Sequence, residues 1–183
     1  MRKIEFLLIQ ITGFMFLNSP EALKFFNSPI EEFIDIPNKD LEYLYQWKNG
    51  NNLQKIKDSE TYEFCSFGYF LSYEEALEYQ KEFITDNYFK TKGYFPIIAS
   101  LKGDFLLIDI TKKNGKVYIY SPGLLINEPM EIYQSIEAFI ETIYQCYYQK
   151  AYKYNQSSHL EVNFELENSI ALKLNPKSEY WRQ

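Results

Sequence analysis

Cysteine and histidine, which often act as nucleophiles, bases or metal ligands, are scarce in this chain. The two cysteines, Cys65 and Cys146, lie far apart among aromatic or aliphatic neighbours, and neither belongs to a pair with metal-ligand spacing. The single histidine, His159, follows two serines and has no candidate partner near it. A catalytic Cys–His pair requires the two side chains within hydrogen-bonding reach, which nothing in the sequence indicates. We therefore expect buried thiols in a reducing cytosol, with no catalytic residue and no metal site.

Carboxylate pairs and turn residues offer no better candidate for catalysis. Glu31-Glu32 and Glu74-Glu75 each fall at the start of an expected helix, where the helix dipole alone favours negative charge. Lys102-Gly103-Asp104 lies beside the expected sheet and is typical of a hairpin turn. The chain contains no glycine-rich phosphate-binding motif and no GxSxG nucleophile elbow. We predict that the protein is not an enzyme and needs no cofactor.

The middle of the chain has the pattern of an antiparallel meander. Three short runs rich in Ile, Leu, Phe, Val and Tyr cover residues 94–100, 104–110 and 116–120. Turn signals at Lys102-Gly103 and Asn114-Gly115 separate them. The second run has apolar side chains on both of its faces, so at least one face of the sheet must be covered by another element.

Several helices are expected to surround this sheet. Residues 132, 136, 139, 140, 143 and 147 are apolar or aromatic and fall on one helical face, which predicts a helix from about 135 to 154 that covers the sheet. Asn38 is expected to cap a helix that ends near Asn49-Gly50. Ser72 and Glu75 form a capping box for another helix. Between these two helices, residues 62–71 have strand composition.

The apolar N-terminal run over residues 6–17 follows Arg2 and Lys3, which is the outline of a signal peptide. Gln10 and Thr12 interrupt the run, and no small-x-small cleavage site follows it. We interpret it as a strand or helix packed on the domain, with a processed leader as the alternative. The run is too short and too polar to span a bilayer, so no membrane partner is expected.

Composition and charge narrow the class of partner. The 183 residues, 46% of them hydrophobic, are enough for one globular domain with a substantial core. A net charge of −6 argues against nucleic acid as a direct partner, because phosphate binding needs clustered Lys and Arg. Residues 21–86 hold fourteen acidic and six basic residues, which predicts an acidic surface. The 17 tyrosines fit core edges and helix faces, and whether they line a groove stays open.

Five short motifs follow one another in a distinctive order: Pro37-x-x-x-Leu41 running into Trp47-x-Asn49-Gly50, Leu71-Ser72-x-Glu74-Glu75-Ala76, Phe95-Pro96-Ile97 before Gly103-Asp104, Lys116-Val117-Tyr118, and Ser135-Ile136-x-x-Phe139-Ile140. Their order and spacing resemble the SMI1/KNR4 family, also called the SUKH superfamily. The resemblance covers roughly residues 22–152. The terminal Leu174-Asn175-Pro176-x-Ser178-x-Tyr180-Trp181 is similar to the tail of many bacterial members.

The resemblance implies an α+β fold, in which a mostly antiparallel sheet with its meander at about 94–120 packs against surrounding helices. It implies a single domain over 1–183, with a core of about 22–152 and a C-terminal extension over 156–183, and it implies no catalysis. Bacterial members look like immunity proteins of polymorphic toxin systems, which bind and neutralise a cognate toxin domain in the cytoplasm. A regulatory scaffold or small-ligand-binding module, as eukaryotic members suggest, is the alternative.

The partner expected on this resemblance is a basic toxin domain, with a nuclease as one candidate, because an acidic binder would associate quickly with a basic face and mask it. Ordinary solvated surface is the competing interpretation for each contact residue. The oligomeric state and the identity of the toxin are open at this point. The expected contact residues are those of an exposed loop, Asp58, Glu60, Tyr62 and Glu63, with the helical stripe Glu74, Glu78 and Glu82 as an alternative.

Overall fold

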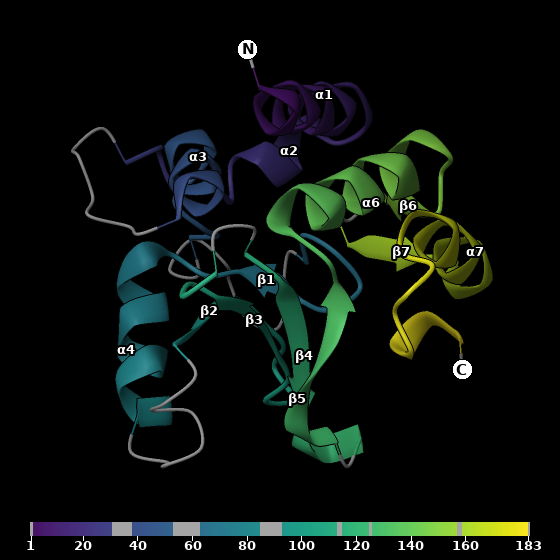
Figure 1. Ribbon diagram of the computed structural model, residues 1–183. Helices are drawn as coiled ribbons and strands as arrows, with labels where there is room; N and C mark the ends of the chain where they lie inside the picture. Colours follow the sequence, from purple (N-terminus) through teal and green to yellow (C-terminus); the bar gives the residue numbers. More distant parts are fainter. Residues whose placement is uncertain are drawn as a thin grey trace.

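The computed structural model describes residues 2–30, 38–52, 63–84, 93–112, 115–124, 126–156 and 159–182. In this part of the chain, α-helices surround a five-stranded antiparallel sheet, and a separate two-stranded sheet lies towards the C terminus (Figure 1). The predicted α+β class is confirmed.

The central sheet follows the order of the sequence and contains the predicted meander. Leu106 on one strand lies opposite both Ile98 and Ile119 on its neighbours, so apolar side chains form a continuous row across the sheet. The turn before this strand is closed by Gly103, whose φ of 85° is readily adopted only by glycine. The strands, each antiparallel to the next, are β1 (Tyr69–Phe70), β2 (Tyr94–Ala99), β3 (Phe105–Asp109), β4 (Val117–Ser121) and β5 (Ile126–Tyr133).

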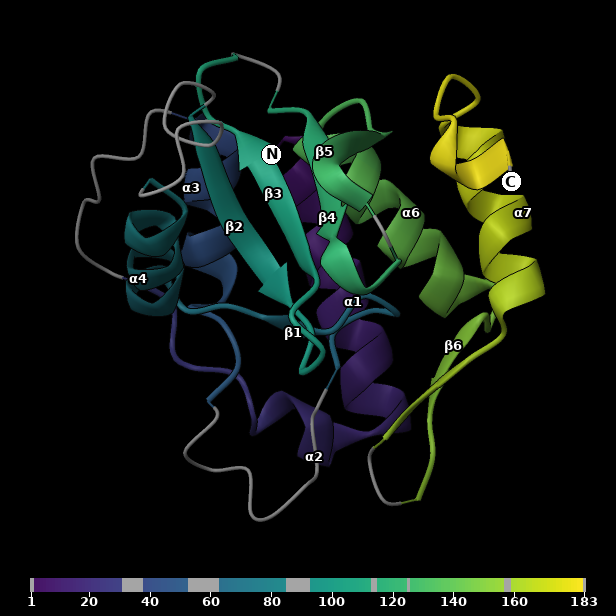
Figure 2. The same ribbon diagram turned by 90° about the horizontal axis from the view of Figure 1, so that it is seen from below.

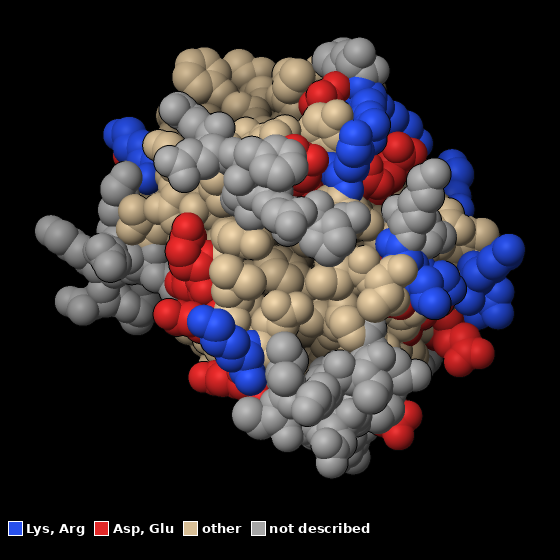
Figure 3. Space-filling view, turned by 60° about the vertical axis from the view of Figure 1, so that its left-hand side comes forward, with Lys and Arg blue, Asp and Glu red and all other residues tan. Residues whose placement is uncertain are grey.

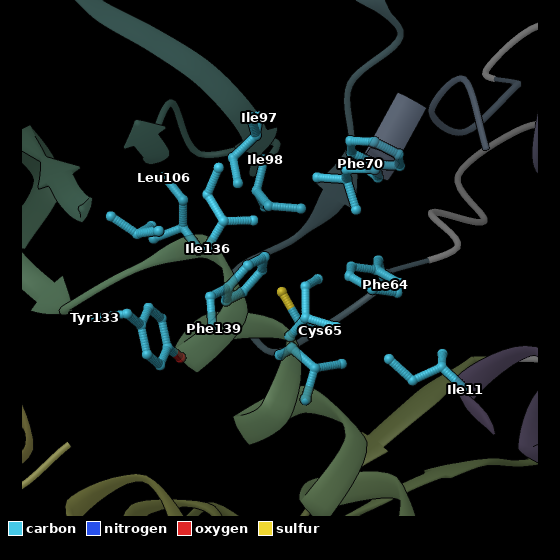
Figure 4. Packing of buried hydrophobic residues seen from close by; sticks show 14 of the residues in the cluster. Ile11, Phe64, Cys65, Phe70, Ile97, Ile98, Leu106, Tyr133, Ile136 and Phe139 are labelled. Atoms are coloured by element: carbon cyan, nitrogen blue, oxygen red, sulfur yellow. The ribbon is translucent and has the colours of Figure 1, made fainter. Parts of the chain in front are cut away.

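Helix α6 (Ile136–Tyr148) covers one face of the sheet, as predicted. Ser135 caps it by accepting a hydrogen bond from the backbone N–H of Ala138 at 3.0 Å. Figure 4 shows Ile136 directed towards Leu106 and the β2 isoleucines, with Phe139 one turn further along the helix. Both side chains are completely buried. The sheet and this helix therefore share one hydrophobic core.

The predicted extension of this helix to residue 154 is wrong. The chain leaves the helix after Tyr148, and Lys150 adopts a φ of 65°, in the left-handed region that ends helices. Strand β6 (Tyr152–Tyr154) then pairs with β7 (Leu160–Val162) to form the second sheet. The aromatic residues of β6 follow the helix directly, but they pair with the next strand in the sequence instead of continuing the helix.

Helix α4 (Tyr73–Ile84) lies beside β2 (Figure 2), and its Ala76 is buried in the main core. The predicted capping box starts it: the Glu75 N–H donates to Ser72 Oγ at 3.2 Å, and the Ser72 N–H donates to Glu75 Oε2 at 2.8 Å. Tyr79 and Phe83 each place a ring centroid 5.0 Å from that of Phe105. Phe83 and Phe105 also pack against Tyr94 and Leu107 in a small second apolar cluster, whereas Tyr79 packs against the main core.

The N-terminal run is a helix packed on the body of the protein, one of the two forms expected. Helix α1 (Lys3–Asn18) buries Ile4, Leu8, Ile11 and Met15 and lies against α6 and α3 (Lys39–Trp47). Asn38 caps α3 as predicted, and the short α2 (Pro20–Leu23) follows α1. None of the described helices is long and apolar enough to cross a membrane.

The segment before β1 is mostly a tight turn rather than the predicted strand over 62–71. The N–H groups of Phe64 and Cys65 both donate to the Gly68 carbonyl, at 2.8 and 3.3 Å. Gly68 has a φ of 132°, which side chains rarely tolerate, so the chain reverses here. This turn brings Ser66 and Phe67 beside the C-terminal segment, where they contact Glu167 and Trp181.

The C-terminal segment folds back onto the body, as predicted. Helix α7 (Phe164–Leu174) is followed by the short 3-10 helix η3 (Tyr180–Arg182). Trp181 is 5% exposed and packs against the rings of Phe67 and Tyr133, each at a centroid distance of about 6 Å.

Phe139→Ala should lower the free energy of unfolding by about 3–5 kcal/mol, because it opens a cavity in a core that cannot collapse around it. Tyr148→Ala, at a 59% exposed position on the same helix, is the control and should change stability by less than about 1 kcal/mol. Urea unfolding followed by circular dichroism measures both. Equal losses would show that α6 is not the covering helix described.

Gly50→Ala should be far more damaging than Gly103→Ala, although both glycines have positive φ. A Cβ at Gly50 would lie 2.2 Å from the Ser72 backbone nitrogen, whereas a Cβ at Gly103 meets open space. We expect a loss of roughly 1–2 kcal/mol at Gly103 from backbone strain alone, and roughly 3 kcal/mol or more at Gly50. The same unfolding measurement tests this, and similar losses at the two sites would contradict it.

Candidate functional site

A groove of about 840 Å³ runs between the central sheet and the C-terminal segment. One side is formed by the turn at 63–69 and by the turn that joins β2 to β3. The other side is formed by α7 and η3, which lie beyond β5 in Figure 2. Its lining thus combines segments from the middle of the chain with segments from its end. A groove of this size, lined largely by apolar atoms, is typical of a binding site.

Three of the large apolar side chains that line the groove are left in contact with solvent. Leu101 is 73% exposed, Leu124 is 67% exposed and Phe164 is 69% exposed. Single exposed apolar residues are common on protein surfaces, but several around one concavity favour an interaction site. We call these three residues the apolar rim.

Asp104 supplies a fixed carboxylate to the groove. Its Oδ2 accepts a hydrogen bond from Ser100 Oγ at 3.0 Å, and its Oδ1 accepts one from Ser121 Oγ at 2.5 Å. Ser100 Oγ also accepts from the N–H groups of Lys102 and Asp104, at 3.1 Å each. The prediction of a hairpin turn at Lys102-Gly103-Asp104 is confirmed. The turn residue Asp104 is also part of the groove.

Glu167 is the most deeply buried charged group of the described residues that line the groove, at 3% exposed. It lies in the first turn of α7, which Asn163 caps by accepting from the Leu166 N–H at 3.1 Å. Its Oε1 accepts hydrogen bonds from Ser66 Oγ, at 2.5 Å, and from the Tyr152 hydroxyl. Burial raises the pKa of the Glu167 carboxyl, and these two hydrogen bonds oppose that rise.

Three distant segments hold this carboxylate in place. Ser66 comes from the turn before β1, Tyr152 from β6 and Glu167 from α7, and the Tyr152 hydroxyl lies 3.2 Å from Ser66 Oγ. Burial raises the pKa of Tyr152 well above its usual range, and the neighbouring Glu167 adds to the effect. The tyrosine therefore stays a hydrogen-bond donor. Buried polar networks of this kind are strongly coupled and rigid.

The predicted loop residues fall mostly outside the described part of the chain. Asp58, Glu60 and Tyr62 lie in the range 53–62, so their role stays a prediction. Glu63 lines the groove and is half-buried, and burial raises the pKa of its carboxyl. Its backbone carbonyl accepts a hydrogen bond from the Tyr154 hydroxyl at 3.1 Å.

The helical stripe that was the alternative prediction lies on α4, outside the groove. Glu74, Glu78 and Glu82 are exposed and recur on one face of α4. Figure 3 shows acidic side chains gathered in a column on the side of the molecule that carries this helix. None of these three residues is among the described residues that line the groove, whereas Glu63 is. Whether the stripe contacts a partner stays a prediction.

Sequence reasoning missed most of this site. Asp104 was assigned only to a turn, and Glu167 has the same local signature as any acidic residue in the first turn of a helix. No local pattern marks Ser66 or Tyr152 as its partners, because contacts between distant segments join them.

The cysteines and the histidine form no reactive centre in the described residues. Cys65 and Cys146 are both buried free thiols, as expected. Burial raises the pKa of the Cys146 thiol to about 12 and that of Cys65 well above its usual range, so neither is a ready nucleophile. No group of three potential ligands among the described residues could hold a metal ion.

The profile of the SMI1 / KNR4 family (SUKH-1) matches residues 29–142, well over half of the chain. The protein belongs to this family. No curated protein matches the chain. The SUKH family is known for immunity proteins and is generally non-catalytic. The matched SUKH-1 region contains the central sheet, α3, α4 and about half of α6, whereas α7 and η3 lie beyond it. One wall of the groove is therefore built outside the matched region. The predicted core limits of about 22–152 stay a prediction.

Glu167→Gln should stabilise the protein at neutral pH while keeping both hydrogen bonds to its Oε1. Burial raises the folded-state pKa of Glu167 above the usual 4.5. The protonated side chain therefore stabilises the fold fully below pH 4.5, and this stabilisation is lost as pH rises through the folded-state pKa. Gln does not titrate.

The difference in unfolding free energy between Glu167→Gln and the wild type should therefore grow from pH 4 to pH 8. Glu165→Gln, an exposed position in the same turn of α7, is the matched control and should show no such growth. Urea unfolding across this pH range measures the difference. A difference that stays constant with pH would contradict the burial of a charged Glu167.

Proposed function

We propose that this SUKH protein is a cytoplasmic immunity protein that binds and neutralises the toxin domain of a polymorphic toxin system. Family membership supports the class of function. The observation that carries the proposal to this chain is the groove, which combines an exposed apolar rim with acidic side chains. A surface of this kind suits a protein partner with basic residues among apolar ones.

Neutralisation needs no chemistry from the immunity protein. Burial of the apolar rim against the toxin supplies affinity, and the carboxylates of the groove select for positive charge. The excess of acidic residues over 21–86 adds a long-range field that speeds association with a basic toxin domain, a nuclease being one example. The immunity protein would bind the toxin in a fixed ratio and would block it by covering the surface that carries its active site.

The second candidate is a regulatory module that binds a small ligand. The size of the groove, about 840 Å³, favours it, because ligand sites commonly measure about 300–1,000 Å³. The tyrosines give it little support: among the described residues that line the groove, only Tyr69 and Tyr180 are tyrosines. Others, such as Tyr45, Tyr133 and Tyr147, are buried in the core.

Co-expression with a toxin domain encoded next to this gene should rescue cell growth, and the two proteins should co-purify in equal amounts. Leu101→Asp combined with Leu124→Asp should abolish rescue, because both changes place charge on the apolar rim. Phe16→Asp, at a 64% exposed apolar position on α1, is the control and should rescue as well as the wild type. Failure of the wild type to rescue or to co-purify would refute the proposal.

The loop residues predicted from the sequence are tested in the same complex. Asp58→Lys with Glu60→Lys should weaken toxin binding, and the loss should shrink as salt screens the interaction. Glu74→Lys with Glu78→Lys tests the stripe on α4 in the same way. Calorimetric titration at low and high salt measures both, and a pair whose reversal leaves affinity unchanged at low salt lies outside the interface.

A further inference from the structure

We propose that the groove receives a lysine or arginine side chain of the partner protein and that Glu167 is the carboxylate that selects it. This inference rests on the proposed function, and it names the chemistry that the partner must present. It assigns recognition to α7, a segment beyond the region that matches the SUKH-1 family.

The geometry of Glu167 leaves one acceptor available. Both hydrogen bonds from Ser66 and Tyr152 end on Oε1. Among the described residues no donor reaches Oε2, although the side chain is only 3% exposed and lines the groove. Oε2 is not among the fully buried side-chain atoms that lack a partner, so it keeps contact with the groove, where a cation that enters can reach it. The two bonds on Oε1 also fix the carboxylate, so it loses little freedom on binding.

The charges around the groove favour a cation. Of the described residues that line it, Glu63, Asp104 and Glu167 are acidic and Lys102 alone is basic. Lys102 lies in an exposed turn, where its ammonium group can remain in water. A cation at Glu167 would thus meet an excess of negative charge beside a carboxylate that is itself 3% exposed, and the attraction strengthens as the partner excludes water from the groove.

The apolar rim explains why the cation should belong to a protein. Lysine and arginine carry their charge at the end of an apolar stem, which packs against apolar surface while the charge reaches inward. Leu101, Leu124 and Phe164 offer that surface, and they extend beyond what one side chain can cover. The best occupant is therefore a basic side chain flanked by apolar residues on a folded partner. A free polyamine could satisfy the carboxylates but would leave the rim exposed.

The first test is calorimetric titration of the neighbouring toxin domain with the full-length protein. Glu167→Gln should weaken binding about tenfold or more, because it removes the charge while it keeps the hydrogen bonds to Oε1. Glu165→Gln should bind as the wild type does. Lys102→Glu, at an exposed position, should tighten binding about threefold at low salt. If the toxin binds the wild type but all three variants match it, the inference is wrong and the proposed function stands.

The second test does not need the toxin, so its failure is separable from that of the proposed function. The two tryptophans of the chain are Trp47 and Trp181, and a Trp47→Phe background leaves Trp181, which lines the groove, as the only tryptophan fluorophore. The probes are the peptides acetyl-Leu-Arg-Leu-amide and acetyl-Leu-Lys-Leu-amide, the citrulline version of the first, and spermidine.

Saturable fluorescence changes with the basic peptides, absent with the citrulline peptide and lost in Glu167→Gln, would support the inference. Tighter binding of spermidine than of either basic peptide would overturn it in favour of a polyamine site. Equal responses to the arginine and citrulline peptides would also overturn it, because recognition would then not depend on charge. The absence of any response up to about 10 mM peptide would do the same.

Discussion

The burial of one face of α6 is the interaction on which the rest of the fold depends. Ile136, Phe139, Ile140 and Ile143 are completely buried between the sheet and α1, and each contributes about 1.5–3 kcal/mol relative to exposure. Without α6, the sheet would leave an apolar face in water, and α1 would lose its packing against that helix. Once α6 is in place, both gain a partner. The groove inherits its rigidity from this core, because Trp181 packs on Tyr133 and Tyr133 packs on Phe139.

Local patterns were enough to predict most elements around this core, and they failed at two places where the chain reverses direction. The meander, the cap at Asn38 and the capping box at Ser72 follow from turn residues and spacing that neighbours in the sequence determine. The end of α6 could not be predicted, because pairing with residues 160–162 draws the aromatic residues after Lys150 into a strand. The strand expected over 62–71 is mostly a turn, because Gly68 allows a reversal that its composition does not reveal.

The sequence indicated that acidic residues would face a partner, but it did not indicate where the groove lies. An excess of acidic residues indicated a negative surface, and Glu63 does lie in the groove. The choice between the loop and the α4 stripe rested on exposure, since exposed carboxylates are the ones that composition makes visible. Glu167 escapes such reasoning, because a buried carboxylate is recognised only when its partners from other segments are known. The pKa of Glu167 is raised by burial, which depends on the whole fold and cannot be inferred from the neighbouring residues in the sequence.

Because α7 and η3 lie beyond the stretch that matches the family, most of the core and the far wall of the groove are encoded in different parts of the chain. The stretch that matches the family carries most of the core, so substitutions there are limited by folding. The far wall of the groove is encoded afterwards, in a short piece of the gene that contributes fewer residues to that core. Under the proposed function, substitutions in this short piece would change the partner that the groove accepts with less effect on folding than substitutions in the sheet or in α6.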